Sequence, residues 1–151
     1  MKPEDVPAGP LLVDTDVFSY FAKRLGPHEA FASLVVGHLL LLSFVTVGEV
    51  MHGAIRAKWG AKKLEELEQT FRRYVVVPGT DEVARQYARV SARYEGRVGA
   101  NDIWIAACAL AVPEHPPLVT NDADFEPIAQ EFGLILVRPE ATSSQSRQPI
   151  P

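Results

Sequence analysis

The chain has 151 residues, of which 47% are hydrophobic and 23% charged, and its formal net charge is −4. This length suits one domain, and the sequence has neither the roughly 20 consecutive apolar residues of a membrane span nor a secretory signal, so we expect a cytoplasmic protein without membrane contact. The acidic balance argues against a generally positive nucleic-acid-binding surface, and the lone cysteine, Cys108, excludes an internal disulfide and is expected to be buried.

Short apolar runs alternate with longer amphipathic stretches along the chain. The short runs predict strands at residues 11–13, 39–42, 75–77, 118–120 and 134–137. The stretches between them predict helices that begin near Val17, run from near Thr46 to about Lys58, cover residues 61–73, run from a Thr80 cap to about Tyr94, cover residues 103–112 and lie within residues 125–132. This alternation is typical of a parallel sheet that has helices on both faces.

The predicted fold is therefore α/β, with three α/β/α layers and a central parallel sheet of about five strands flanked by helices. The domain covers residues 11–138. Residues 1–10 form an N-terminal extension, and residues 139–151 lack the apolar side chains needed for packing, so we expect a disordered tail there.

Four acidic residues stand where an apolar run meets a predicted loop or helix start: Asp14, Glu49, Asp102 and Asp122. Ligands of open α/β sheets bind beyond the carboxyl ends of the strands, and Asp14 and Asp122 fall at such ends. If the four carboxylates converge, they form an acidic pocket without an obvious counter-charge. Such a pocket suits a divalent cation, because Mg²⁺ prefers hard oxygen ligands.

Each acid also has an ordinary structural explanation. Glu49 follows Thr46 at the spacing of a capping box, which would place a helix start there. Asp102 could favour a helix start through the helix dipole, with Asn101 as the cap. The acids that follow the strands could be turn residues, and we keep this interpretation for Asp16 and Asp124. The metal-site hypothesis therefore depends on the joint pattern.

Four segments, in this order and spacing, resemble the PIN-domain ribonucleases and most closely the VapC toxins of toxin–antitoxin pairs. They are Leu-Leu-Val-Asp14-Thr-Asp16-Val-Phe, Thr46-Val-Gly-Glu49, Gly99-Ala-Asn101-Asp102-Ile-Trp-Ile-Ala-Ala and Leu-Val-Thr120-Asn-Asp122-Ala-Asp-Phe125. The resemblance covers about residues 11–138. It implies a Mg²⁺- or Mn²⁺-dependent endoribonuclease that cuts RNA, is held inactive by a VapB-type antitoxin and forms a homodimer.

The same resemblance implies roles for individual residues. The residues that it marks as catalytic are Asp14, Glu49, Asp102, Asp122 and Thr120. The four acids in this set would also be the metal ligands. We rank Asp14 and Asp102 as direct ligands, with Glu49 and Asp122 completing the site or orienting the attacking water. Asn101 matches a further polar position of the family, and the family frequently has Asn where this chain has Asp16.

Arginines recur every four residues in the segment before the third acid. Arg85, Arg89 and Arg93 would share one helix face, and Arg97 lies just beyond. They could form a solvated helix face or a basic rim that leads an RNA phosphodiester towards the acids. Arg97, the nearest to Asp102 in sequence, is the first candidate RNA contact, followed by Arg93 and Arg89.

Two other functions fit part of the pattern. Asp14-Thr-Asp16-Val resembles the nucleophile motif of haloacid-dehalogenase-like phosphatases, in which Asp14 would attack phosphorus. That family needs a lysine before its last acidic motif, whereas this chain has none after Lys63. The other alternative is a non-catalytic PIN-type module that binds RNA or protein, although the presence of all four acids favours catalysis.

Overall fold

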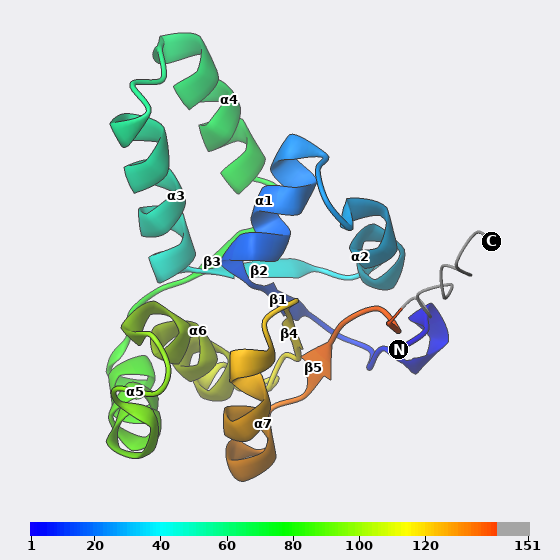
Figure 1. Cartoon of the computed structure of the whole chain (residues 1–151), viewed down its shortest axis with the longest axis vertical. Helices are drawn as coiled ribbons and strands as arrows, with labels where there is room; N and C mark the ends of the chain where they lie inside the picture. The colour runs from blue at the N-terminus through cyan, green and yellow to red at the C-terminus, as the bar shows by residue number, and fades with distance from the viewer. Residues whose placement is uncertain (142–151) are drawn as a thin grey trace, which may run out of the picture.

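Strand β1 (Leu11–Val13) lies at the centre of an all-parallel sheet in the computed structural model, which describes residues 1–141 (Figure 1). The sheet has five strands in the order β3-β2-β1-β4-β5. The other strands are β2 (Leu40–Ser43), β3 (Val75–Val77), β4 (Leu118–Val119) and β5 (Leu136–Val137). The chain order reverses between β1 and β4, and the carboxyl ends of such neighbours border a binding crevice.

Helices cover both faces of the sheet, as the alternation of the sequence predicted. One layer contains α1 (Thr15–Lys23), α2 (His28–Val35), α3 (Phe44–Arg56) and α4 (Ala61–Phe71), and the other contains α5 (Asp81–Tyr94), α6 (Ala100–Ala111) and α7 (Glu126–Phe132) (Figure 1). Each face of the sheet has its own hydrophobic core, the first beneath α1–α4 and the second beneath α5–α7. Successive side chains of a strand point to opposite faces, so Leu11 and Val13 belong to the first core and Leu12 to the second. The three-layer α/β/α prediction is confirmed.

Helix α6 is the central helix of its layer. Its side chains are buried on nearly every side, including Ile103, Ile105 and Cys108, and it packs along α5. A helix that is apolar all round belongs in a protein interior. The expected burial of Cys108 is confirmed. Asp102 lies in the first turn of this buried helix.

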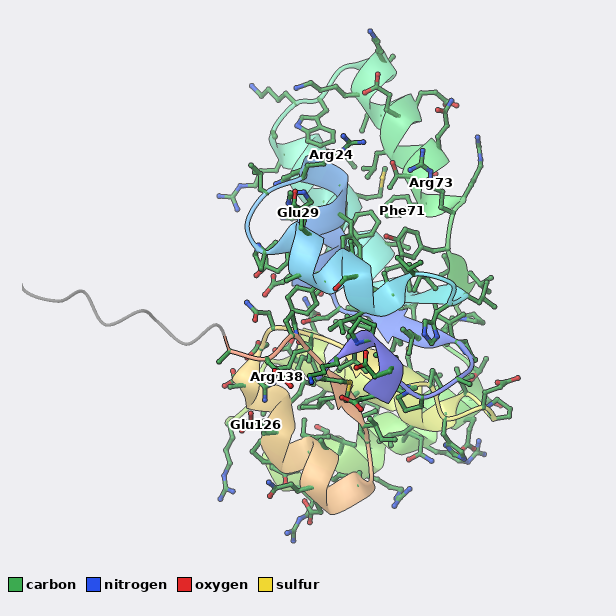
Figure 2. The ribbon with its side chains drawn as sticks, turned by 90° about the vertical axis from the view of Figure 1, so that its right-hand side faces the viewer. Arg24, Glu29, Phe71, Arg73, Glu126 and Arg138 are labelled. Atoms are coloured by element: carbon green, nitrogen blue, oxygen red, sulfur yellow. The ribbon has the colours of Figure 1, made fainter. Side chains whose placement is uncertain are left out.

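Two terminal segments pack onto the domain. A 3₁₀ helix, η1 (Pro3–Asp5), contacts α2, and Val6 after it is buried in the first core. At the other end, Arg138 follows β5 and pairs with Glu126 at the start of α7 (Figure 2). The predicted disordered tail at residues 139–151 lies, from residue 142 onwards, outside the described part of the chain.

The helix starts differ from the sequence predictions in three places. Helix α1 begins at Thr15 rather than near Val17, because Asp14 already caps it. Helix α3 begins at Phe44 with Ser43 as its cap, so the capping box at Thr46 is wrong. Helix α6 has Gly99 at the capping position, which makes Asn101 the second residue of the helix and not its cap.

One helix was not predicted, and one cap was predicted correctly. Residues 28–35, for which no element was predicted, form α2 and bury Phe31 and Leu34. The Thr80 cap is confirmed, because its hydroxyl accepts a hydrogen bond from the Val83 amide over 3.3 Å. No helix among residues 1–141 is both long enough and apolar enough to cross a bilayer.

Candidate active site

Buried polar side chains gather at one edge of the sheet. Within residues 1–141, the buried polar or charged residues are Asp14, Ser43, Thr46 and Thr120. Asp14 follows β1, Ser43 ends β2, Thr46 lies in the first turn of α3, and Thr120 follows β4. Burial of polar groups is costly unless they are hydrogen-bonded. Because these four residues also lie at the carboxyl edge of the sheet, where α/β proteins bind ligands, they indicate a functional site.

The carboxylate of Asp14 is buried and is held in place by two hydrogen bonds. Its side chain is 3% exposed, one oxygen accepts from the Thr15 amide at 2.7 Å, and the other accepts from the Thr120 hydroxyl at 2.8 Å. The first contact caps α1, and the second joins the ends of β1 and β4. Asp14 therefore has a single orientation, which is what a metal ligand or a catalytic group requires.

A pair of threonines connects Asp14 with Glu49. The hydroxyls of Thr15 and Thr46 lie 2.9 Å apart, and Thr15 Oγ1 also donates to Glu49 Oε1 at 3.5 Å. Thr46 and Glu49 are separated by about one turn of α3, so both face α1. This network, and not a helix cap, explains the threonine and the glutamate in the sequence.

Three further carboxylates meet near the start of α6. Oxygen atoms of Asp102, Asp122 and Asp124 lie within 4.8 Å of one another. Asp102 sits in the first turn of α6, whereas the other two belong to the loop after β4 and its 3₁₀ helix η2 (Ala123–Phe125). The amide of Asp122 donates to Thr120 Oγ1 at 3.0 Å, and the amide of Asp124 donates to Asp122 Oδ1 at 2.9 Å.

Burial, helped by neighbouring charges, raises the pKa values of Asp14, Asp102 and Glu49. Burial raises the pKa of Asp14 to about 6, with smaller contributions from the charges of Asp16 and Asp122, while the hydrogen bonds from Thr120 and Thr15 act in the opposite direction. Burial also raises the pKa of Asp102 to about 7, helped by repulsion from the neighbouring acids, Asp14 first. The pKa of Glu49 is raised too, mainly by burial.

This donor set fits a divalent cation. All the charged groups are carboxylates, the ligand type that Mg²⁺ and Mn²⁺ accept, and the cluster of three brings its oxygens close enough to share one ion. Within residues 1–141, the arginines nearby in sequence form no ion pair with these acids. The carboxylates that could hold the ion are Asp102, Asp122 and Asp124, with Asp14 next to them and Glu49 beyond Thr15.

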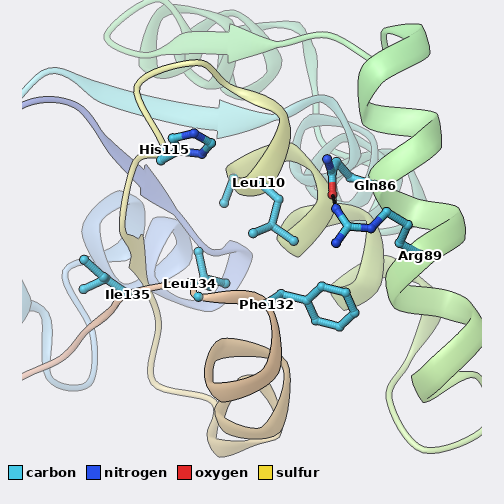
Figure 3. A pocket seen from close by; sticks show the side chains of 9 residues that line it. Gln86, Arg89, Leu110, His115, Phe132, Leu134 and Ile135 are labelled. Atoms are coloured by element: carbon cyan, nitrogen blue, oxygen red, sulfur yellow. Dashed lines mark hydrogen bonds between the residues drawn. The ribbon is translucent and has the colours of Figure 1, made fainter.

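Two arginines of α5, Arg89 and Arg93, have partners away from the acids. Arg93 pairs with Glu131 of α7 at 2.7 Å, and Arg89 donates to Gln86 and lies 5.5 Å from the ring centre of Phe132. Figure 3 shows Arg89 in a hollow of about 230 Å³ that His115 and Leu110 also line. His115 precedes β4 and Leu110 lies near the end of α6, so this hollow is at the opposite edge of the sheet from the acids.

Arg97 is placed differently from the other two arginines. It lies in the exposed loop between α5 and α6, a few residues before Asp102, and its amide donates to the Tyr94 carbonyl. Its side chain forms no ion pair within the described residues. Of the three arginines that the sequence suggested for RNA binding, Arg97 alone belongs to a segment that leads to the acidic site.

Comparison with known proteins identifies the family. The sequence profile of the PIN domain matches residues 11–131, which is most of the chain. The chain belongs to the PIN-domain family. Its carboxylate-lined edge is thus part of a PIN domain, and this membership contradicts the haloacid-dehalogenase-like alternative for Asp14.

A curated relative shares this domain. The chain is 26% identical over 106 residues to the protein named Ribonuclease VapC1 of Haemophilus influenzae (strain R2866), an alignment that covers 67% of this chain and 79% of that protein.

Solved structures show the same PIN fold. VapBC2 from Rickettsia felis, bound to a DNA fragment from its promoter, matches with a TM-score of 0.69 and 21% identity over 85% of this chain and 97% of that one. VapBC-5 from Mycobacterium tuberculosis, described as a member of the VapBC family of toxin–antitoxin systems, matches with a TM-score of 0.64 and 26% identity over 87% and 99%. These likenesses confirm the predicted PIN-like fold.

Sequence reasoning left out three residues of this edge. Asp124 was kept as a turn residue, but its carboxylate lies with Asp102 and Asp122. Thr15 was not considered, and Thr46 was considered only as a cap, although their hydroxyls connect α1 with α3. The signal for Asp124 was its two-residue spacing from Asp122, which allows one aspartate to accept the other's amide and brings both acids to one side.

Proposed function

We propose that this PIN domain is a Mg²⁺- or Mn²⁺-dependent endoribonuclease and the toxin of a VapBC-type pair. The observation that carries the proposal is the convergence of acids at the carboxyl edge of the sheet. Oxygen atoms of Asp102, Asp122 and Asp124 lie within 4.8 Å of one another, and the pKa values of Asp14 and Asp102 are raised. Groups arranged in this way suit hydrolysis of a phosphodiester at a cation site.

Each residue has a proposed task. Asp14 and Asp102 hold the cation directly, Glu49 and Asp122 complete the site or orient the attacking water, and Thr120 fixes the orientation of Asp14. When bound, the cation would neutralise the clustered carboxylates and stabilise the negative charge that develops on the phosphate. Arg97 is the proposed contact for the RNA backbone, because arginine binds phosphate through two parallel hydrogen bonds; Arg93 and Arg89 are weaker candidates, since both already have partners.

The proposed partners come from the relatives. The curated relative is named a ribonuclease, and the structural neighbours are VapBC toxin–antitoxin assemblies. We therefore include RNA as the substrate and a VapB-type antitoxin as the inhibitor. A homodimer as the functional form rests on the resemblance to VapC toxins described above. A cytoplasmic location follows from the RNA substrate in the same proposal.

Inducible expression tests the activity and the substrate together. RNA 5′ ends are sequenced from cells that express the parent, Asp14→Asn or Asp102→Asn, with Glu4→Gln as a control because Glu4 is exposed on η1. Discrete new ends for the parent and the control, but not for the site variants, would support the proposal. Cleavage by purified parent must also disappear in EDTA and return with Mn²⁺.

Two results would contradict the proposal. Equal RNA cleavage by the parent and by a folded Asp102→Asn protein would remove the acids from catalysis and leave a non-catalytic binding module as the better explanation. If the parent still cleaves RNA in EDTA, the reaction does not depend on a cation.

A further inference from the structure

A groove extends from the acidic site along helix α3. It has a volume of about 480 Å³ and is lined by Val45, Gly48, Glu49, His52 and Asn101. The first four recur at intervals of three and four residues, which places them on one face of α3, and Asn101 comes from the first turn of α6 on the other side. Because Glu49 also contacts Thr15, the groove is continuous with the carboxylate site.

The chemistry of this groove differs from that of the acidic site. Beyond Glu49 it contains no carboxylate, and its walls offer an amide from Asn101, an imidazole from His52 and the apolar surface of Val45. Neither Asn101 nor His52 makes a side-chain hydrogen bond within residues 1–141. The volume lies in the range of pockets that hold small ligands, roughly 300–1,000 Å³.

Gly48 has no explanation in the fold itself. Glycine inside a helix is unfavourable because of its backbone entropy, and α3 continues for eight residues after it. A Cβ atom at position 48 would meet nothing within 4 Å, so packing does not require its absence. The space that a side chain would occupy is the groove, and glycine is a suitable residue where a ligand approaches the backbone closely.

We infer that this α3–α6 groove holds the nucleotide next to the cleaved bond of a single-stranded RNA, that Asn101 and His52 contact that nucleotide, and that Gly48 leaves room for it. The inference rests on the proposed ribonuclease activity. Proteins recognise single-stranded RNA by hydrogen bonds to the edges of unstacked bases, which an asparagine amide can donate and accept. Val45 supplies an apolar wall for the base.

Gly48→Gln and Gly53→Gln form a matched pair of tests. Gly53 lies in the same helix, and a Cβ atom there would also meet nothing within 4 Å, but Gly53 does not line the groove. Both substitutions should raise the melting temperature, by about 2 °C, since glutamine is the better helix former. Only Gly48→Gln should raise the KM for short single-stranded RNA oligonucleotides of randomised sequence, by about tenfold with little change in kcat.

Asn101→Ala tests recognition separately from occlusion. Sequencing the products of the randomised RNA gives the base preference on each side of the cut. We expect this variant to relax the preference at one position next to the cut and to raise KM about fivefold, as for the loss of one hydrogen bond to a neutral group. A purely structural role for Asn101 would lower activity without changing the preferred base.

The outcomes separate this inference from the proposed function. If the parent cleaves RNA and Gly48→Gln cleaves it with the parental KM and base preference, the groove is not a nucleotide site and the ribonuclease proposal stands. If the purified parent neither cleaves nor binds the RNA pool with Mn²⁺, both fail. The inference would also be overturned if Gly53→Gln raised KM as much as Gly48→Gln does, because the effect would then come from α3 as a whole.

Discussion

The Thr120 hydroxyl donates to Asp14 Oδ2 at 2.8 Å and, on its other side, accepts the amide of Asp122 at 3.0 Å. One buried hydroxyl thus sets the orientation of a carboxylate on β1 and the course of the loop after β4. It also lowers the proton affinity of Asp14, against the effect of burial.

Thr120→Val should therefore shift the pH dependence of RNA cleavage. The substitution keeps the shape of the side chain but removes the hydrogen bond, so the pKa of Asp14 rises further above about 6 and the acidic limb of the pH–rate profile moves to higher pH. Thr120→Ser retains the hydroxyl and should keep the parental limb. Superimposable profiles for all three proteins would show that this hydrogen bond does not control Asp14.

Without a divalent ion, the protein should lose stability as the pH rises from about 4 to about 7. The pKa values of Asp14 and Asp102 are raised from 3.8 to about 6 and about 7, so the folded state binds more protons than the unfolded state in this range. The effect is on the order of 3 kcal/mol for the buried Asp14. Urea unfolding in EDTA at several pH values measures it.

Millimolar Mn²⁺ should remove most of this loss, because it compensates the carboxylates near neutral pH. In a properly folded sample, an unchanged melting temperature in Mn²⁺ at pH 7.5 would count against a cation site at these acids.

Asp124→Asn should weaken cation binding. Its carboxylate lies within 4.8 Å of those of Asp102 and Asp122, so its removal takes one negative charge from the cluster while the asparagine amide can still occupy the turn. We expect the Mn²⁺ concentration for half-maximal stabilisation to rise severalfold, on the order of 1 kcal/mol. Glu126→Gln, one residue beyond η2, is the control, and equal Mn²⁺ titrations for both variants would exclude Asp124 from the site.

Arg97→Ala should weaken RNA binding more than Arg93→Ala does. Arg93 is paired with Glu131, whereas Arg97 is exposed in the loop that leads to Asp102. Loss of one phosphate contact should reduce the slope of log affinity against log salt by about 1. Arg72→Ala serves as the comparison, because Arg72 lies just after α4 in an exposed ion pair with Glu65. If Arg97→Ala kept the parental salt slope, Arg97 would not contact the RNA.

Ser43→Ala should destabilise the fold by about 1 kcal/mol through loss of the α3 cap. Its hydroxyl accepts from the Val45 amide at 3.1 Å and lies 3.3 Å from the Cys108 sulfur. Thermal melting measures the effect, and Ser33→Ala, on the exposed side of α2, should leave the melting temperature nearly unchanged. A stability loss no greater than that of Ser33→Ala would mean that α3 does not depend on this cap.

The strands and the acids at their ends could be predicted because each signal is local. A run such as Leu11–Val13 is too short for a helix and is followed directly by Asp14, and the carboxyl ends of parallel strands share one edge. The alternation of such runs with helical stretches then gave the layered fold. Asp14 was correctly placed at the end of a strand, although α1 begins two residues earlier than predicted, and Asp102 was correctly placed in the first turn of a helix.

The cap of α3 could not be decided from the sequence. Ser43 and Thr46 are both residues that cap helices, and only Thr46 has a glutamate three positions later. What decides is a contact across 31 residues, because Thr46 is buried against Thr15 and its hydroxyl is already used there. Helix α2 was missed because Pro27 precedes it and gives no side-chain cap, so its only sequence signal was the spacing of Phe31 and Leu34.

The Asp14–Thr120 contact spans 106 residues of chain. Loop closure over such a distance comes late, because its entropy cost must be met before the contact can form. During synthesis, the carboxylate edge therefore cannot assemble until β4 and the Asp122–Asp124 loop have emerged and paired with β1. A chain released before this point would have no complete site, so the hydrolytic chemistry proposed for this protein can begin only after Asp124 has been synthesised and β4 has paired with β1.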